Sequence, residues 1–97
     1  MITIQDIKDY SKPHDINGGR VTRIGNKDVM FSIVGGVSGL YGDFKDTFEV
    51  AIFDNEKHNF ITKFFYPEAS DDVIGYMKSE DVEKLVNQVL SKGFQVF

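Results

Sequence analysis

Residues 46–66 read DTFEVAIFDNEKHNFITKFFY and predict a β-hairpin with large apolar side chains on both of its faces. The return strand is expected over residues 60–66. A hairpin with one face in water needs only one apolar face, so we expect both faces of this hairpin to be covered. One cover would be a helix of the same chain, and the other a second subunit or a partner. In the first strand the alternating residues are Phe48, Val50 and Ile52 on one face, and Ala51 and Phe53 on the other.

Upstream of this hairpin, the pattern predicts two further strands, over residues 20–24 and 28–34, joined by a tight turn. A short helix is expected over about residues 4–10, where Thr3 and Asp6 have capping-box spacing. The glycine-rich run GGVSGLYG, which follows the second strand, predicts a bend, a bulge or a long hairpin loop.

Downstream, residues 73–77 predict a short strand, and a helix is expected to begin after Ser79 as its N-cap. This helix would end near Gly93, and the apolar tail at 94–97 would pack back as an edge strand or plug. Its apolar residues recur at the spacing of one helical face: Val82, Leu85, Val86, Val89 and Leu90.

The connections between these elements are too short for parallel crossovers. We therefore expect an α+β fold in a single small domain over residues 1–97. Its antiparallel sheet would have four to five strands, with the C-terminal helix packed across one face and a short N-terminal helix.

The composition narrows the class of protein. The 97 residues contain no cysteine and carry a net charge of −4, which argues against disulfides and against a direct nucleic-acid binder. No apolar run approaches the ~20 residues of a membrane span, and the N-terminus does not have the pattern of a secretory signal. We expect a cytoplasmic protein, and the Asp-, Lys-, Asn- and Ile-rich composition is typical of a low-GC bacterial or phage genome.

Motifs for chemistry are weak. The glycine run is not followed by Lys-Ser/Thr or a helix, as a phosphate-binding loop requires. His14 and His58 are the only histidines, and neither has a second histidine at metal-ligand spacing. Without cysteine, an activated nucleophile is hard to assemble. The sequence therefore predicts no catalytic site, no metal site and no cofactor.

Two surfaces remain as candidate interaction sites. The acidic segment has two open interpretations: helix capping and solubility, or a negative surface that meets a basic partner. Its residues are Glu68, Asp71, Asp72, Glu80, Asp81 and Glu83. The aromatic surplus predicts an oligomer or partner interface, against the alternative that the chain's own loops cover it. The candidate interface residues are Phe53, Phe65, Tyr41 and Phe44.

The leading hypothesis is a small non-enzymatic protein that binds another protein or a second copy of itself. An acidic inhibitor that mimics nucleic acid, or a small-molecule-binding module that uses the glycine-rich loop, are the alternatives.

Overall fold

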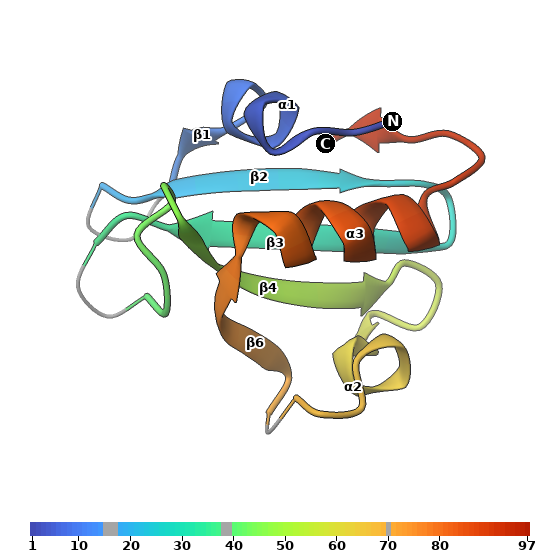
Figure 1. Cartoon of the computed structure of the whole chain (residues 1–97). Helices are drawn as coiled ribbons and strands as arrows, with labels where there is room; N and C mark the ends of the chain where they lie inside the picture. The colour runs from blue at the N-terminus through green and yellow to red at the C-terminus, as the bar shows by residue number, and fades with distance from the viewer. Residues whose placement is uncertain (15–17, 38–39, 70) are drawn as a thin grey trace.

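The computed structural model describes residues 1–14, 18–37, 40–69 and 71–97 of the chain. It confirms the predicted α+β class, with one antiparallel sheet, a C-terminal helix and a short N-terminal helix (Figure 1). The elements are α1 (Ile4–Asp9), β1 (Lys12–Pro13), β2 (Arg20–Gly25), β3 (Val29–Gly35), β4 (Thr47–Asp54), β5 (Asn59–Phe60), α2 (Thr62–Phe65), β6 (Val73–Lys78), α3 (Ser79–Val89) and β7 (Gln95–Val96).

The centre of the sheet is the antiparallel meander β2–β3–β4, in which Ile24, Phe31 and Ile52 lie side by side in one row. The outer edge of β2 pairs with two short strands, β1 and β7. The outer edge of β4 is likewise shared, between β5 at its end and β6 along residues 47–51. The predicted C-terminal edge strand is therefore present as β7.

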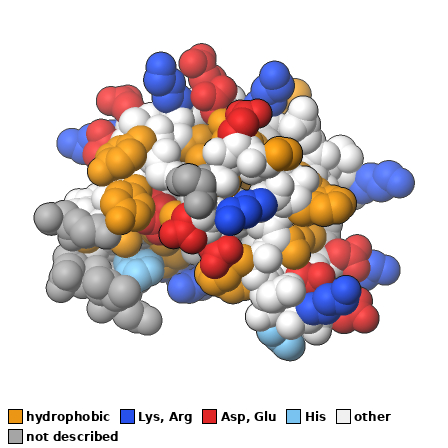
Figure 2. All heavy atoms as spheres, turned by 90° about the horizontal axis from the view of Figure 1, so that it is seen from below, with side chains coloured by type: hydrophobic (Ala, Val, Ile, Leu, Met, Phe, Trp, Pro, Cys, Tyr) orange, Lys and Arg blue, Asp and Glu red, His pale blue; other side chains and the backbone are white. Residues whose placement is uncertain are grey.

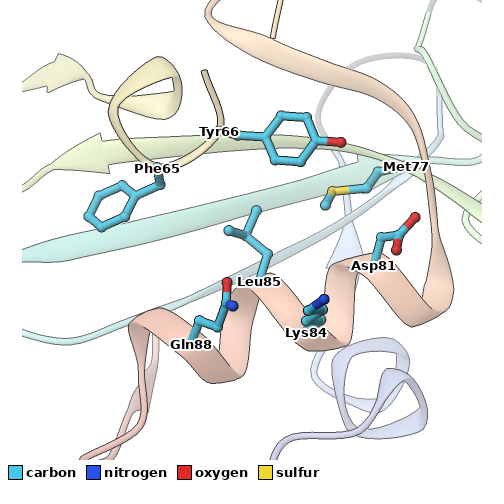
Figure 3. A pocket seen from close by; sticks show the side chains of 7 residues that line it. All are labelled: Phe65, Tyr66, Met77, Asp81, Lys84, Leu85 and Gln88. Carbon is cyan, nitrogen blue, oxygen red and sulfur yellow. The ribbon is translucent and has the colours of Figure 1, made fainter. Parts of the chain in front are cut away.

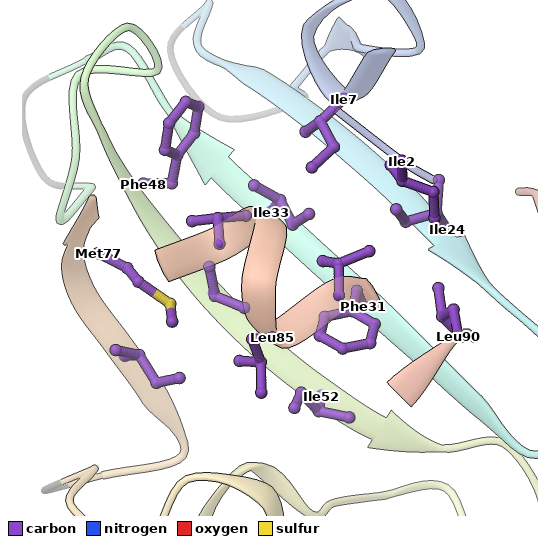
Figure 4. Packing of buried hydrophobic residues seen from close by; sticks show 14 of the residues in the cluster. Ile2, Ile7, Ile24, Phe31, Ile33, Phe48, Ile52, Met77, Leu85 and Leu90 are labelled. Atoms are coloured by element: carbon purple, nitrogen blue, oxygen red, sulfur yellow. The ribbon is translucent and has the colours of Figure 1, made fainter. Parts of the chain in front are cut away.

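The hydrophobic core lies between the sheet and α3, which crosses one face (Figures 1 and 4). The alternation of β4 is confirmed, because Phe48, Val50 and Ile52 are all fully buried in this core. The apolar stripe of α3 is also confirmed: Val82, Leu85, Val86 and Leu90 are buried, and Val89 is half-buried against the same cluster.

The N-terminal helix α1 has the predicted capping box, in which Thr3 and Asp6 exchange side-chain-to-backbone hydrogen bonds. Buried Thr22 holds this helix to the core side of the sheet, because its hydroxyl donates to the Ile7 carbonyl at 2.6 Å. Segment 1–4 is joined to α3 as well, since the backbone N–H of Ile4 donates to the Glu83 carboxylate at 2.5 Å.

The predicted return strand over residues 60–66 is wrong beyond Phe60. Helix α2 begins at Thr62, because the outer edge of β4 over residues 47–51 is already paired with β6. The Thr62 hydroxyl accepts the Ile52 N–H at 3.0 Å, in place of the carbonyl of a neighbouring strand. The same hydroxyl donates to the Asp72 carbonyl at 2.5 Å. Within residues 61–66 (ITKFFY), Phe65 therefore packs against the core from a helix and not from a strand.

The predicted N-cap of α3 is shifted by one residue. Strand β6 runs directly into the helix, so extended Lys78 occupies the cap position and Ser79 is the first helical residue. The Ser79 backbone N–H donates to the Asp46 carbonyl at 3.2 Å, which joins the start of the helix to the β3–β4 connection. The helix itself ends at Val89, earlier than the Gly93 expected from sequence.

The glycine-rich connection between β3 and β4 folds back tightly on β4, with residues 38–39 lying outside the described part. A side chain at Gly42 would lie 2.7 Å from the Phe48 Cα, and one at Gly35 would lie 2.8 Å from the Phe44 nitrogen. Glycine at these two positions is therefore explained by close backbone approach.

Candidate functional site

The face of the sheet opposite α3 is not covered by any described helix, because α1, α2 and α3 all contribute to the core side. Side chains alternate across a strand, so the strand register identifies the residues that point to this other side. We call this surface the open face, and its residues are Val21, Arg23, Met30, Ser32, Val34, Glu49, Ala51, Phe53, Phe60 and Val73. Val21, Val34 and Ala51 are buried, so the chain itself covers part of this face.

One end of the open face is aromatic and aliphatic. Phe53 pairs with Met30 on β3 and with Phe60 on β5, and the Phe53 and Phe60 ring centroids are 4.2 Å apart. Phe60 remains 42% exposed, although it stacks on Phe53. Half-buried Val73 lies beside Ala51 in the neighbouring row. This end therefore exposes apolar surface in the single chain.

The middle of the open face carries opposite charges on different strands. Exposed Arg23 lies on β2 beside Ser32, whereas half-buried Glu49 lies on β4 beside Val34. The Glu49 carboxylate accepts the backbone N–H of Tyr41 at 3.2 Å, so its position is set by the loop that precedes β4.

Two tyrosines border the open face next to Glu49. Tyr41 and Tyr76 are 52% and 64% exposed, and their ring centroids are 5.9 Å apart. A β-bulge in β6 places Gly75 and Tyr76 opposite Glu49, and the Tyr76 N–H donates to the Tyr41 carbonyl at 2.7 Å. Tyr76 has φ +53°, which non-glycine residues rarely adopt. Backbone strain of this kind is concentrated at functional sites.

The four candidate interface residues do not form one surface. Phe53 is on the open face and Tyr41 is at its border. Phe44 is only 8% exposed and packs edge-to-face on Phe48 in the core, with ring centroids 5.2 Å apart. Phe65 is half-buried on the α3 side of the sheet, so it cannot share a contact surface with Phe53.

Sequence reasoning missed most of this surface, including Met30, Phe60 and Tyr76. Met30 and Phe60 follow from the pairing register with Phe53, once Phe53 is assigned to the outer face. Tyr76 depends on the bulge in β6, for which the sequence has no signal beyond the preceding Gly75.

A second feature is the groove between α2 and α3 (Figure 3). Two adjoining pockets, of about 270 and 400 Å³, share Phe65, Leu85 and Gln88 as lining residues. In Figure 3, Leu85 and Met77 form the inner part, while Asp81 and Lys84 project from α3 at the rim. The groove is apolar at its base and polar at its border, and nothing in it identifies an occupant.

The acidic segment is divided by β6. Glu68, Asp71 and Asp72 precede this strand, whereas Glu80 and Asp81 follow it in the first turn of α3. The two groups are thus separated by a six-residue strand, which spans about 17 to 20 Å. Figure 2, seen from the β6 and α2 side, shows acidic and basic side chains interspersed. The sixth member of the set, Glu83, is already used as an acceptor by α1.

Two other carboxylates organise turns. Backbone N–H groups of Thr47, Lys45 and Asp46 donate to Asp43 and hold the pKa of its carboxyl well below the ordinary value of 3.8. Asp54 caps the β4–β5 turn, where the N–H groups of Lys57 and Glu56 lower its pKa. Both carboxyls are ionised at neutral pH, so their geometry fits turn stabilisation.

The histidines lie apart, His14 beside the start of β2 and His58 in the β4–β5 turn. Within the described ranges, no group of three or more histidine and carboxylate residues has the arrangement of a metal site.

Comparisons with protein-family models, with curated proteins and with solved structures gave no significant match to this chain. None of the helices in the described ranges is long and apolar enough to span a bilayer. The candidate function must therefore be argued from the surface itself.

Proposed function

We propose that this chain is a non-enzymatic protein-interaction protein that acts through the open face, most simply by forming a homodimer. The observation that supports the proposal is the exposed apolar end of that face, where Phe53 and Phe60 stack outside the core. Aromatic residues are enriched at interfaces, and exposed apolar patches on small proteins mark contact sites.

A second copy is the simplest partner. Closed two-fold dimers are the commonest assemblies, and their contact uses the same surface on both chains. The sheet has one layer of helices, and packing two open faces together would complete a sandwich with sheets about 10 Å apart.

The test compares two phenylalanines in equilibrium sedimentation. Phe53→Asp places an unpaired charge in the proposed contact, and we expect a folded monomer where the wild type is a dimer. Phe64→Asp is the matched control: Phe64 is 79% exposed but belongs to α2, outside the open face, so this variant should remain dimeric.

A wild type that sediments as a single 11.0 kDa chain at high concentration would contradict the proposal. Dissociation by Phe64→Asp instead of Phe53→Asp would place the contact on the helix side.

A further inference from the structure

From the charges on the open face, we infer a specific contact: Arg23 of each chain binds Glu49 and the Tyr41–Tyr76 pair of a second copy. This inference rests on the proposed homodimer and names the residues that determine its geometry. The second copy is identified as the partner because the open face carries both halves of the contact, an exposed cation and a carboxylate bordered by aromatic rings.

The strand register fixes the spacing of the two Cα positions. Arg23 and Glu49 are two strands and two residues apart, which corresponds to about 12 Å on a regular sheet. A two-fold axis that bisects the line between them exchanges the two positions, so each Arg23 meets the other chain's Glu49.

The same axis passes close to Phe53. On the regular lattice, Phe53 is about 12 Å from Arg23 and about 14 Å from Glu49. A residue almost equidistant from two exchanged positions lies close to the axis that exchanges them. Phe53 would therefore pack against its own copy, with the two charged contacts further along the axis.

The surroundings of Glu49 suit an arginine side chain. A guanidinium ion can donate hydrogen bonds to a carboxylate and stack on an aromatic face. Both tyrosine rings are exposed here, and the backbone hydrogen bond between Tyr76 and Tyr41 holds them together. The positive φ of Tyr76 has a function in this arrangement, because it belongs to the bulge that places Tyr76 opposite Glu49.

Charge reversal tests this geometry directly. Arg23→Glu alone would place two carboxylates together in both contacts, and Glu49→Arg alone would place two guanidinium ions together. We expect each purified variant to dimerise at least about tenfold more weakly than the wild type. When the two variants are mixed in equal amounts, a heterodimer should form, because one contact is then native and the other is reversed but attractive.

The control is Lys27→Glu, which reverses a charge in the exposed β2–β3 turn outside the open face and should leave the dimer intact. Circular dichroism checks that each variant is folded. If Glu49→Arg does not fold, Glu49→Gln keeps an acceptor for the Tyr41 N–H. Combined with Arg23→Gln in a double-mutant cycle, it should show coupling between the two sites.

The outcomes separate this inference from the proposed function. A wild-type monomer overturns both. A wild-type dimer that Phe53→Asp dissociates, but that withstands both charge reversals, overturns the Arg23–Glu49 contact alone. The Arg23–Glu49 contact is also overturned if the two reversal variants stay monomeric when mixed. It is likewise overturned if the effects of Arg23→Gln and Glu49→Gln on dimerisation simply add in the double-mutant cycle.

Discussion

Thr62 joins three segments through one hydroxyl group, and its loss should be more costly than that of Thr22. The Thr62 hydroxyl accepts the Ile52 N–H and donates to the Asp72 carbonyl, whereas the Thr22 hydroxyl donates only to Ile7. Both residues are at most 1% exposed. An unsatisfied buried partner costs about 1 to 3 kcal/mol.

We therefore expect Thr62→Val to lower the free energy of unfolding by about 2 to 4 kcal/mol, and Thr22→Val by about 1 to 2 kcal/mol. Urea unfolding of the two variants measures both values. Equal losses would show that the α2 contact is no stronger than the α1 contact.

Asp43 should make the free energy of unfolding depend on pH in the acidic range. Because its pKa is lowered in the folded state, its contribution is present above the ordinary value of 3.8 and is lost as the pH falls below it. Asp43→Asn should be less stable than the wild type at neutral pH, and the difference should shrink progressively as the pH falls below the ordinary value of 3.8. Thermal melts across this range test it. Asp46→Asn, which removes a neighbouring exposed carboxylate, is the control.

At the scale of elements, α3 is the main cover of the core, and Leu85 lies between the sheet and the groove. Leu85→Ala removes a side chain that is 5% exposed, and such changes cost about 2 to 5 kcal/mol. We expect the lower half of this range, because the adjoining groove lets the site collapse or take up water. Urea unfolding measures the loss, and exposed Gln88→Ala on the same groove is the matched control. A melting temperature unchanged within a degree would contradict the role of α3.

The elements that local periodicity encodes were predictable from sequence. The two-residue alternation of β4 and the helical stripe of α3 each bury the side chains that the pattern selects. Residues 61–66 were not predictable in this way, because whether they form a strand depends on β6 occupying the edge of β4. Because of the same competition for the edge of β4, Phe65 lies on the α3 side of the sheet. Phe44 lies in the core because of the way the glycine-rich connection folds. Of the candidate interface, only Phe53 and Tyr41 were placed correctly relative to the open face.

At the scale of the whole molecule, helices cover one face of the sheet, and no described helix covers the other. A 97-residue domain buries a smaller share of its surface than larger domains do, so a second layer would add apolar burial at the end of the open face where Phe60 is exposed. In a homodimer this burial depends on protein concentration. The stability of the chain and its assembly should then be linked.

The melting temperature of the wild type should therefore rise with protein concentration. For a dimer that unfolds to two chains of this size, each tenfold increase should raise it by about 3 to 5 °C. Phe53→Asp should abolish this dependence while Phe64→Asp retains it, because only Phe53 lies in the proposed contact. Scanning calorimetry over a hundredfold concentration range makes the comparison. A wild-type melting temperature independent of concentration, together with a monomeric mass, would contradict the proposed homodimer.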